Sequence, residues 1–422
     1  MKRYDSYKPS GVSWIGEIPG HWRITQLREF LSLVSEKGHG DKQLLSVTRE
    51  QGVIIRDVES KESNHNYIPD DLSGYKLVKV GQLAINKMKA WQGSYAVSAY
   101  EGIVSPAYYV CDVNFENKDF FSWAIRSKAY VPFFSQMSKG IRVDQWDLST
   151  NALKEIPFFV PSSEEQHKIV GFLSEKTTLI DEQQADIAKE IELLKELKQA
   201  EIANVVTHGL NPDVKMKKSE IPWLAEIPRH WQEQRAKYLF IKENRPVREE
   251  DEVITCFRDG QVTLRKNRRT EGFTESFKEI GYQGIRVGDL VIHQMDAFAG
   301  STGVSDSEGK STPVYIVCTP ADENIYNPYY AYVIRNMGLN GFIQSLYRGI
   351  RERSSNFSYD VFCNQLLPIP PVEEQKAIVE YIKQKTSAID EMIAKLKSQS
   401  KFLTEYKQRL NADVVTGQVK VD

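Results

Sequence analysis

Apolar residues recur every seven positions in two long stretches of the chain, which is the spacing of a coiled-coil helix. The first stretch follows Pro161 and contains no proline and no glycine except Gly171 before Gly209 and Pro212. Ser162 and Glu165 form an S-x-x-E capping box at its start. Its seam residues are Leu173, Thr177, Ile180, Gln184, Ile187, Ile191 and Leu194. The pattern predicts one helix of about 46 residues, roughly 70 Å long at 1.5 Å per residue.

The second stretch begins near Val372 and repeats the same pattern in phase. Its two seams consist of Ile382, Ile389, Leu396, Leu403 and Leu410, and of Val379, Thr386, Ile393 and Ser400. A helix of this length cannot bury its own apolar stripe, so each stretch needs a partner helix. Residues 163–201 carry a net charge of −5 and residues 372–413 a net charge of +1. This difference in charge mildly favours pairing of the two helices with each other, although the apolar seams carry the argument. Because the chain is duplicated with an approximate internal two-fold, as described below, we expect the paired helices to run antiparallel.

Between the helices the pattern changes to short runs that are rich in β-branched and aromatic residues, with glycines between them. This pattern extends from Ile24 to about Ile156 and again from Gln232 to about Leu367. The runs are typical of strands in a compact mixed sheet. Each set leads into one amphipathic helix, over 120–137 and over 329–346. The predicted fold class is α+β, with two tandem α/β domains joined by two long helices that form an antiparallel coiled coil.

The chain repeats itself at an offset of 209 residues. WIGEIPGHW at 14–22 returns as WLAEIPRHW at 223–231, and Glu-Glu-Gln at 164–166 returns at 373–375. The same offset relates Gly-Ile-Arg at 140–142 to 349–351, and Val-Val-Thr at 205–207 to 414–416. Several matches at one offset indicate a duplicated protein with an approximate internal two-fold.

Composition excludes several classes of protein but does not indicate a function. Of the 422 residues 41% are hydrophobic and 27% charged, and the net charge is −2, which is typical of globular domains and not of disordered chains. No run approaches about eighteen apolar residues and the start lacks a signal peptide, so we expect a cytoplasmic protein without a membrane span. The four widely spaced cysteines are expected to be buried small hydrophobes.

Catalytic motifs are incomplete. Gly309-Lys310-Ser311-Thr312 resembles the end of a phosphate-binding loop, but Val304 stands where the motif needs glycine, so a hairpin loop is expected there. Asn327-Pro328-Tyr329-Tyr330 is one proline short of the N-P-P-[YF] motif of adenine methyltransferases. The seven histidines show no metal-ligand spacing, and we expect His21 and His230 to cap or pack.

Three features together resemble the specificity (S) subunit of type I restriction-modification enzymes. They are SGVSWIGEIPGHW, the run AWQGSYAVS with GIVSPAY, and the entry LLPIPPVEEQ into a long helix with an Ile-Asp pair. The first copy departs slightly, because EIPFFVPSSEEQ has serine in place of the second proline. The resemblance covers nearly the whole chain, twice over.

The resemblance implies that each globular part is a target-recognition domain for one half of a bipartite, asymmetric DNA sequence. The helices would act as a spacer and as the docking surface for two methyltransferase (M) subunits. In this family the S chain performs no chemistry and holds no cofactor. The M subunits bind S-adenosylmethionine and methylate adenine, and restriction (R) subunits translocate and cut double-stranded DNA with ATP and Mg.

The repeat and the resemblance together predict six segments. These are an N-terminal segment 1–24, recognition domain 25–158, long helix 159–212, linker 213–233, recognition domain 234–367 and C-terminal long helix 368–422. Residues 25–158 contain 16 basic and 16 acidic residues, and residues 234–366 contain 17 of each. Neutralisation of phosphates supplies most non-specific DNA affinity, so a neutral domain should hold DNA weakly without partner subunits.

Candidate DNA-binding residues are side chains whose donors suit phosphates or base edges, or whose ring can stack on a base. In the first domain they are Lys87, Lys89, Trp91, Gln92, Lys139, Arg142 and Gln145. In the second domain they are Arg265, Lys266, Arg268, Arg269, His293, Gln294, Arg348, Arg351 and Arg353. A charged cluster on a protein surface is more often a solvated face than a binding site, so the prediction concerns the two sets of residues and not any single member.

Two alternatives stay open at this point: a coiled-coil scaffold that never touches DNA, and a DNA-binding regulator without a restriction role. A regulator is expected to carry a helix-turn-helix, which the sequence lacks. A scaffold explains the helices but not two divergent domains with matching flanks. Purification with and without a co-encoded methyltransferase would discriminate these classes.

Overall fold

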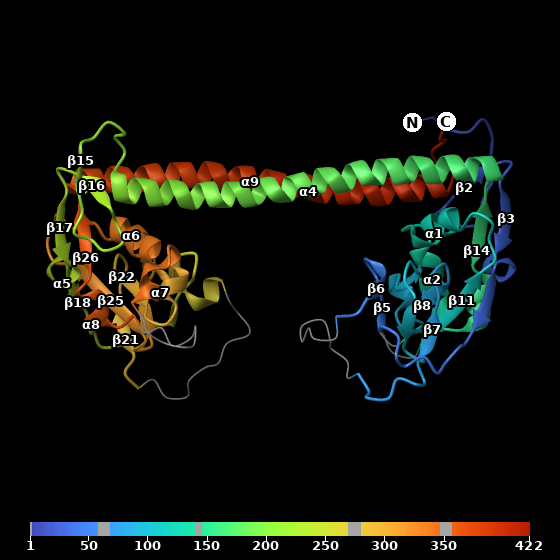
Figure 1. Cartoon of the computed structure of the whole chain (residues 1–422), viewed down its shortest axis with the longest axis horizontal. Helices are drawn as coiled ribbons and strands as arrows, with labels where there is room; N and C mark the ends of the chain where they lie inside the picture. The colour runs from blue at the N-terminus through green and yellow to red at the C-terminus, as the bar shows by residue number, and fades with distance from the viewer. Residues whose placement is uncertain (1, 58–67, 141–145, 269–279, 347–356) are drawn as a thin grey trace. The chain divides into compact units, whose positions relative to one another are not determined.

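The computed structural model describes residues 2–57, 68–140, 146–268, 280–346 and 357–422. The chain divides into two compact units (Figure 1). Unit 1 consists of Met1–Ala188 and Lys397–Asp422, and unit 2 consists of Lys189–Leu396. Each unit combines one globular part with a portion of both long helices. No helix in the described part of the chain is long and apolar enough to cross a membrane.

The two predicted long helices are present as α4 (Ser163–His208) and α9 (Val372–Val415). The predicted capping box opens α4, because the Ser162 amide donates to Glu165 Oε2 at 3.1 Å and the Glu165 amide donates to Ser162 Oγ at 3.3 Å. Gly209 follows the helix with a φ of 77°, a left-handed conformation that favours glycine and ends the helix.

Within each unit the two helices are antiparallel neighbours. In unit 1 the Gln184 side chain donates to Thr404 Oγ1 at 2.7 Å, and Lys407 pairs with Asp181. In unit 2 Lys198 pairs with Asp390 at 2.7 Å. The residue numbers on one helix rise as those on the other fall. Predicted seam residues are buried in both units, including Leu173, Ile180, Ile187, Leu194, Ile382, Ile389, Ile393 and Leu410.

The globular part of unit 1 contains a four-stranded antiparallel sheet and several two-stranded ribbons. The sheet has the order β4 (Leu31–Val34), β11 (Tyr109–Val113), β8 (Leu83–Ile85), β9 (Tyr95–Val97). The ribbons are β1 (Tyr7–Pro9) with β2 (Glu17–Pro19), β3 (Arg23–Gln26) with β14 (Pro157–Val160), β5 (Leu45–Thr48) with β6 (Gly52–Ile55), β7 (Lys76–Val78) with β10 (Gly102–Val104), and β12 (Ser138–Lys139) with β13 (Asp147–Leu148).

The globular part of unit 2 repeats this arrangement. Its four-stranded sheet has the order β18 (Phe240–Lys242), β25 (Tyr315–Pro320), β22 (Leu290–His293), β23 (Thr302–Val304). Its ribbons are β15 (Met216–Lys218) with β16 (Glu226–Pro228), β17 (Gln232–Arg235) with β26 (Leu366–Ile369), β19 (Ile254–Cys256) with β20 (Val262–Leu264), and β21 (Gln283–Ile285) with β24 (Gly309–Ser311). The residues that resemble a phosphate-binding loop therefore form strand β24, not the hairpin loop expected.

Two sequence expectations about the globular parts are wrong in detail. The strand pairs are antiparallel, and parallel contact among the described residues is limited to isolated bridges such as Leu44 with Ile103. The helix expected over 120–137 is two helices, α1 (Lys118–Arg126) and α2 (Val131–Met137). Ser127 adopts an extended conformation at the end of α1, and Pro132 lies in the first turn of α2, where its missing N–H costs no bond.

The second copy is broken in a similar way. The helix expected over 329–346 is α6 (Asn327–Leu339) followed by α7 (Phe342–Ser345), and Gly341 between them has a φ of 82°. The remaining short helices are α3 (Thr150–Glu155), α5 (Ala236–Leu239) and α8 (Tyr359–Phe362), with one-turn 3-10 helices η1 (Leu27–Glu29), η2 (Ala90–Gln92), η3 (Arg265–Asn267) and η4 (Ala297–Ala299).

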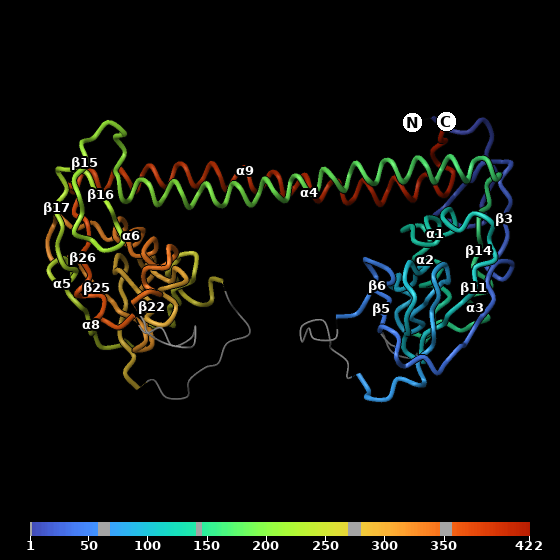
Figure 2. The backbone as a smooth tube through the Cα atoms, viewed as in Figure 1, coloured from blue at the N-terminus to red at the C-terminus, as the bar shows by residue number. Residues whose placement is uncertain are grey.

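One apolar core in each unit joins the globular part to the helix pair. In unit 1 this core contains Trp22 together with Leu173 from α4 and Leu410 from α9. In unit 2 it contains Trp231 together with Val206 and Ile382. Figure 2 traces how the two chain ends meet in unit 1, where Lys2 and Lys420 form an antiparallel bridge. Three cysteines are buried as expected, whereas Cys363 is only partly buried.

Candidate nucleic-acid interface

A tight loop carries several of the candidate residues in each unit, and it follows the strand that lies third in the spatial order of the four-stranded sheet. In unit 1 the loop follows β8 and contains η2, which ends at Gly93 with a φ of 98°. In unit 2 the loop follows β22 and contains η4, which ends at Gly300 with a φ of 88°. We call residues 86–93 loop A and residues 293–300, which include the last residue of β22, loop B. The two loops share a backbone conformation but differ in side chains, because Lys87 and Lys89 correspond to Gln294 and Asp296 at an offset of 207.

Loop A lies next to the second candidate cluster of unit 1. The Lys87 ammonium is 2.8 Å from Asp147 Oδ2, and strand pairing places Lys139 opposite Asp147. The Leu148 amide donates to the Lys87 carbonyl at 3.1 Å. The hydrogen bond with Asp147 raises the pKa of Lys87, so this ammonium stays charged. The structure therefore brings Lys87 and Lys139 together, although they are far apart in sequence.

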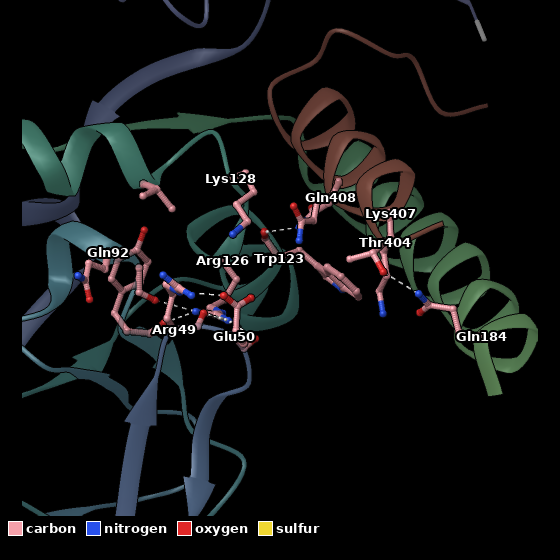
Figure 3. A pocket seen from close by; sticks show the side chains of 14 residues that line it. Arg49, Glu50, Gln92, Trp123, Arg126, Lys128, Gln184, Thr404, Lys407 and Gln408 are labelled. Carbon is pink, nitrogen blue, oxygen red and sulfur yellow. Dashed lines mark hydrogen bonds and ion pairs between the residues drawn. The ribbon is translucent and has the colours of Figure 1, made fainter. Parts of the chain in front are cut away.

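The other loop A candidates differ in how far they are engaged. Lys89 is exposed, and no side-chain bond holds its ammonium within the described residues. Trp91 packs against Trp146 with ring centroids 5.2 Å apart and donates its indole N–H to the Met88 carbonyl at 3.2 Å. Gln92 is partly buried and lines a cavity (Figure 3). Trp91 is thus held by packing, and its contact with DNA stays a prediction.

The cationic run that begins at Arg265 is engaged by its own surroundings. Lys266 pairs with Glu252 at 2.6 Å, and Arg265 donates to Thr255 Oγ1 at 3.4 Å. Arg268 pairs with Asp259 at 2.7 Å and lies 4.3 Å over the Phe257 ring. DNA phosphates would have to compete with these carboxylates, which weakens the case for simple phosphate binding.

Loop B presents a polar surface of a different kind. The His293 ring meets the Tyr315 ring edge-on at 4.7 Å, and His293 Nδ1 accepts from the Asp296 amide at 3.1 Å. Burial lowers the pKa of His293 despite the nearby Asp296 carboxylate, which favours the neutral imidazole. The Gln294 side chain donates to the Pro313 carbonyl at 3.2 Å, and the Gln294 carbonyl accepts from the Phe357 amide at 2.9 Å.

Six candidates lie outside the described residues: Arg142, Gln145, Arg269, Arg348, Arg351 and Arg353. Two described residues that follow these candidates in sequence form backbone hydrogen bonds with the loops. The Leu148 amide donates to loop A, and the Phe357 amide donates to loop B. These positions do not test whether any of the sixteen candidate residues contacts DNA, so all sixteen remain predictions.

Sequence reasoning missed a pair of arginines at an offset of 209, Arg126 and Arg335. Arg126 ends α1, and its guanidinium donates to four carbonyls at 2.9–3.0 Å: those of Arg49, Glu50, Gly93 and Tyr95. Arg335 on α6 donates to the carbonyls of Arg258 and Gly300 at 3.0 and 2.8 Å. Burial lowers the pKa of both guanidinium groups. Neither forms an ion pair with a described carboxylate.

A cavity adjoins each of these arginines. In unit 1 a cavity of about 370 Å³ is lined by Arg126, Glu50 and Trp123 from the globular part and by Gln184 and Lys407 from the helices. Figure 3 shows Arg126 beside Arg49 and Glu50, with Gln184 bonded to Thr404 on the helix side. In unit 2 a cavity of about 280 Å³ is lined by the corresponding Arg335 and Asp259. Among the described residues no group of His, Cys, Asp and Glu could hold a metal ion.

Comparison with known proteins gives a consistent result. The chain is 23% identical over 443 residues to the putative type I restriction enzyme MjaX specificity subunit of Methanocaldococcus jannaschii, covering 96% of each chain. It is 21% identical over 428 residues to the type I restriction enzyme MjaVIII specificity subunit of the same organism, covering 96% of this chain and 94% of that one. No family model matches the chain.

Two solved structures share the fold. One belongs to a study of complex assembly and conformational transition of the type I R-M system, with a TM-score of 0.64, 15% identity, and coverage of 95% of this chain and 99% of that chain. The other is the HsdS subunit from Thermoanaerobacter tengcongensis, with a TM-score of 0.53, 16% identity, and coverage of 95% and 98%. The resemblance to type I specificity subunits is thereby confirmed over nearly the whole chain.

Proposed function

We propose that this chain is the DNA-recognition subunit of a type I restriction-modification complex, that it recognises a bipartite asymmetric target, and that it docks two M subunits. The observation that carries the proposal is the pair of loops on a repeated scaffold. Loop A and loop B share a backbone conformation, but Lys89 in one corresponds to Asp296 in the other. A cation and a carboxylate favour different base edges, so the two units would recognise different half-sites.

A partner that binds in two identical copies needs two equivalent surfaces. One such pair of surfaces on the helices is marked by exposed apolar side chains whose positions are related by the offset of 209. They are Leu193 (55% exposed) and Leu197 (48%) on α4 in unit 2, and Phe402 (65%) and Tyr406 (48%) on α9 in unit 1. Exposed apolar pairs one helical turn apart are typical of a surface that a partner covers. We call these two pairs the docking patches.

The docking patch on α9 faces away from the globular part of unit 1. On α9, the residues that line the unit 1 cavity are Thr404, Lys407, Gln408 and Asn411. At about 100° per residue these lie on average roughly 170° around the helix from Phe402 and Tyr406. The patch is therefore left open by the fold of the unit. We propose that an apolar helical segment of one M subunit covers each patch.

The chemistry of the complex would belong to the partners. S-adenosylmethionine would bind to the M subunits, and ATP and Mg to the R subunits, while this chain supplies recognition and assembly. The long helices would also act as the spacer between the two half-sites. A coiled-coil scaffold without DNA recognition has less support, because likeness to specificity subunits extends over 96% of the chain.

The test is reconstitution with a co-encoded M subunit. Purified alone, the chain should transfer no methyl group, and with M it should form a complex with two M subunits per chain by native mass spectrometry. The complex should methylate adenines within one bipartite sequence. Exchange of residues 25–158 for the domain of a relative should change one half of that sequence only. Methylation by the isolated chain, or a single contiguous target, would contradict the proposal.

A further inference from the structure

We propose that Arg126 and Arg335 are positioning residues, each of which fixes the recognition loop of its own unit and thereby controls recognition of one half-site. The inference rests on the proposed function, because it needs loops A and B to lie at the DNA. It adds a residue pair that does not itself contact DNA.

Arg126 joins two separate segments of unit 1 to helix α1. Its Nη1 donates to the carbonyls of Gly93 and Tyr95, at the end of loop A. Its Nη2 donates to the carbonyls of Arg49 and Glu50, in the turn between β5 and β6. Figure 3 shows Arg126 beside Arg49 and Glu50 of this turn. Because Gly93 ends η2, the bond at Gly93 fixes the position of the loop that carries Lys89 and Gln92.

Arg335 makes the equivalent connection in unit 2. Its Nη1 donates to the carbonyl of Gly300, which ends η4 in loop B, and to the carbonyl of Arg258, in the turn between β19 and β20. The acceptors Arg49 and Arg258 correspond at the same offset of 209 as the two arginines themselves. The same connection is thus built twice, on loops whose exposed side chains differ.

The chemistry of the connection requires arginine. In Arg126 each of the two Nη atoms holds one segment, so the planar guanidinium sets the distance between the segments, which a compact lysine ammonium cannot reproduce. In Arg335 the Nη1 atom bonds the carbonyls of both segments. Neither guanidinium has an ion-pair partner among the described carboxylates, so its hydrogen-bond acceptors are carbonyl groups. The Glu50 carboxylate near Arg126 and the Asp259 carboxylate near Arg335 add a longer-range attraction to the partly buried charge. In unit 2 the turn between β19 and β20 lies so close to Arg335 that a Cβ at Gly260 would be 2.3 Å from Arg335 Nη1.

Loss of the fork should therefore release the loop without opening the core. The hydrogen bonds of Arg126 involve only backbone carbonyls of the turn and of residues 93–95, whereas the core of unit 1 is formed by apolar residues such as Trp22 and Phe158. A released loop samples several positions, so the binding free energies for DNA with correct and with incorrect bases become more similar. The expected effect is relaxed specificity and not simply weaker binding.

The experiment compares Arg126→Gln, Arg335→Gln and the exposed control Lys128→Gln in the complex with M. Arg126→Gln should raise methylation of sites mismatched in one half-site by about tenfold relative to the cognate site, as expected for a 1.4 kcal/mol change. Arg335→Gln should do the same for the other half-site only, and Lys128→Gln should change neither. Arg126→Lys serves as a second variant if the glutamine variant does not fold, and it should relax the same half-site.

A second measurement does not depend on DNA. In the isolated chain, hydrogen exchange of the amides of residues 49–52 and 93–96 should become faster in Arg126→Gln, while amides in the α4 seam keep their protection. Unchanged exchange in the turn and loop, or relaxation of both half-sites by one variant, would overturn the inference. If the wild-type complex methylates no bipartite target, the proposed function fails, and the exchange experiment alone decides whether these arginines position the loops.

Discussion

His21 Nε2 lies 2.9 Å from the Oε2 atom of Glu165, the acidic residue of the capping box that opens helix α4. The adjacent Trp22 donates its indole N–H to the same carboxylate at 3.4 Å. The second copy repeats the contact, with His230 2.8 Å and Trp231 3.1 Å from Glu374 at the start of α9. The repeated EIPxHW motif therefore attaches the segment before each globular part to the start of a long helix. This agrees with the expectation that the two histidines cap or pack.

The Glu165 contact predicts a pH-dependent stability. Burial works to raise the pKa of the Glu165 carboxyl, but hydrogen bonds from Ser162, His21 and Trp22 outweigh burial and hold the pKa below its ordinary value of 4.5. The carboxylate thus stabilises the fold above about pH 4.5, and its contribution is lost as the pH falls through the lowered pKa. Glu165→Gln should lower the free energy of unfolding by about 0.5–1 kcal/mol at pH 7.

The difference between wild type and Glu165→Gln should shrink as the pH falls below 4.5, because the carboxyl first takes up a proton in the unfolded chain and then, as the pH passes the lowered pKa, in the folded chain. Urea denaturation at pH 7 and pH 3.5, followed by circular dichroism, measures this difference. Glu164→Gln is the matched control, because the Glu164 carboxylate is 80% exposed and its ion-pair partner among the described residues is the exposed Lys168. An equal loss in both variants, or a Glu165 effect that does not change with pH, would contradict the role of this contact.

The helix pair should depend on its apolar seam far more than on its ion pairs. Ile389 is 7% exposed and packs in a cluster with Leu194 and Ile393. Ile389→Ala should cost about 2–4 kcal/mol of stability because it leaves a cavity. Asp390→Asn removes the exposed pair with Lys198 and should cost less than about 1 kcal/mol. Urea denaturation of both variants compares the two, and similar losses would mean that charge pairing holds the helices.

Much of the architecture could be predicted because it rests on local patterns. The heptads, the box of Ser162 with Glu165, and Gly209 determine the helices and their ends through contacts within a few residues. The break after Arg126 was missed because the amphipathic pattern continues through Ser127, and the pattern alone does not reveal where the backbone turns. The antiparallel pairing was expected from the repeat and is found within each unit.

The candidate site was harder to predict because its contacts are distant in sequence. Lys87 and Asp147 are 60 residues apart, and no pattern indicates that they pair. Arg126 and Arg335 lie on helices as AIR and VIR, where an arginine is ordinarily solvated. The available signal was that Arg126 and Arg335 are related by the offset of 209, although the sequences of the two domains otherwise differ. Their function as bridges between carbonyls required the folded chain.

The docking patches predict a stepwise loss of M subunits. Phe402→Glu and Leu193→Glu each place a charge in one apolar patch, which would be costly to bury against a partner. Each variant should form a complex with one M subunit, and the double variant should form none, by native mass spectrometry. Both side chains are more than half exposed, so the fold should be retained. Lys401→Glu, about 100° around α9 from Phe402, is the control and should keep two M subunits.

The spacer prediction concerns the two points at which the unit boundary crosses the helices, after Ala188 in α4 and after Leu396 in α9. Insertion of seven residues at both points preserves the heptad phase and leaves the contacts within each unit unchanged. It adds about 10 Å at 1.5 Å per residue, or about three base pairs at 3.4 Å each. The unspecified gap between the half-sites should lengthen accordingly, while both half-sites stay the same.

The insertion also turns the contacted half-sites relative to each other, since three base pairs are roughly a third of a helical turn of DNA. Activity should therefore fall unless the DNA twists to compensate, but methylation that remains should occur only at the longer gap. Insertion of five residues at both points rotates the seam by about 140° between the units and should abolish activity. Methylome sequencing distinguishes the outcomes. Full activity at the original gap in the seven-residue variant would mean that the helices do not set the distance between half-sites.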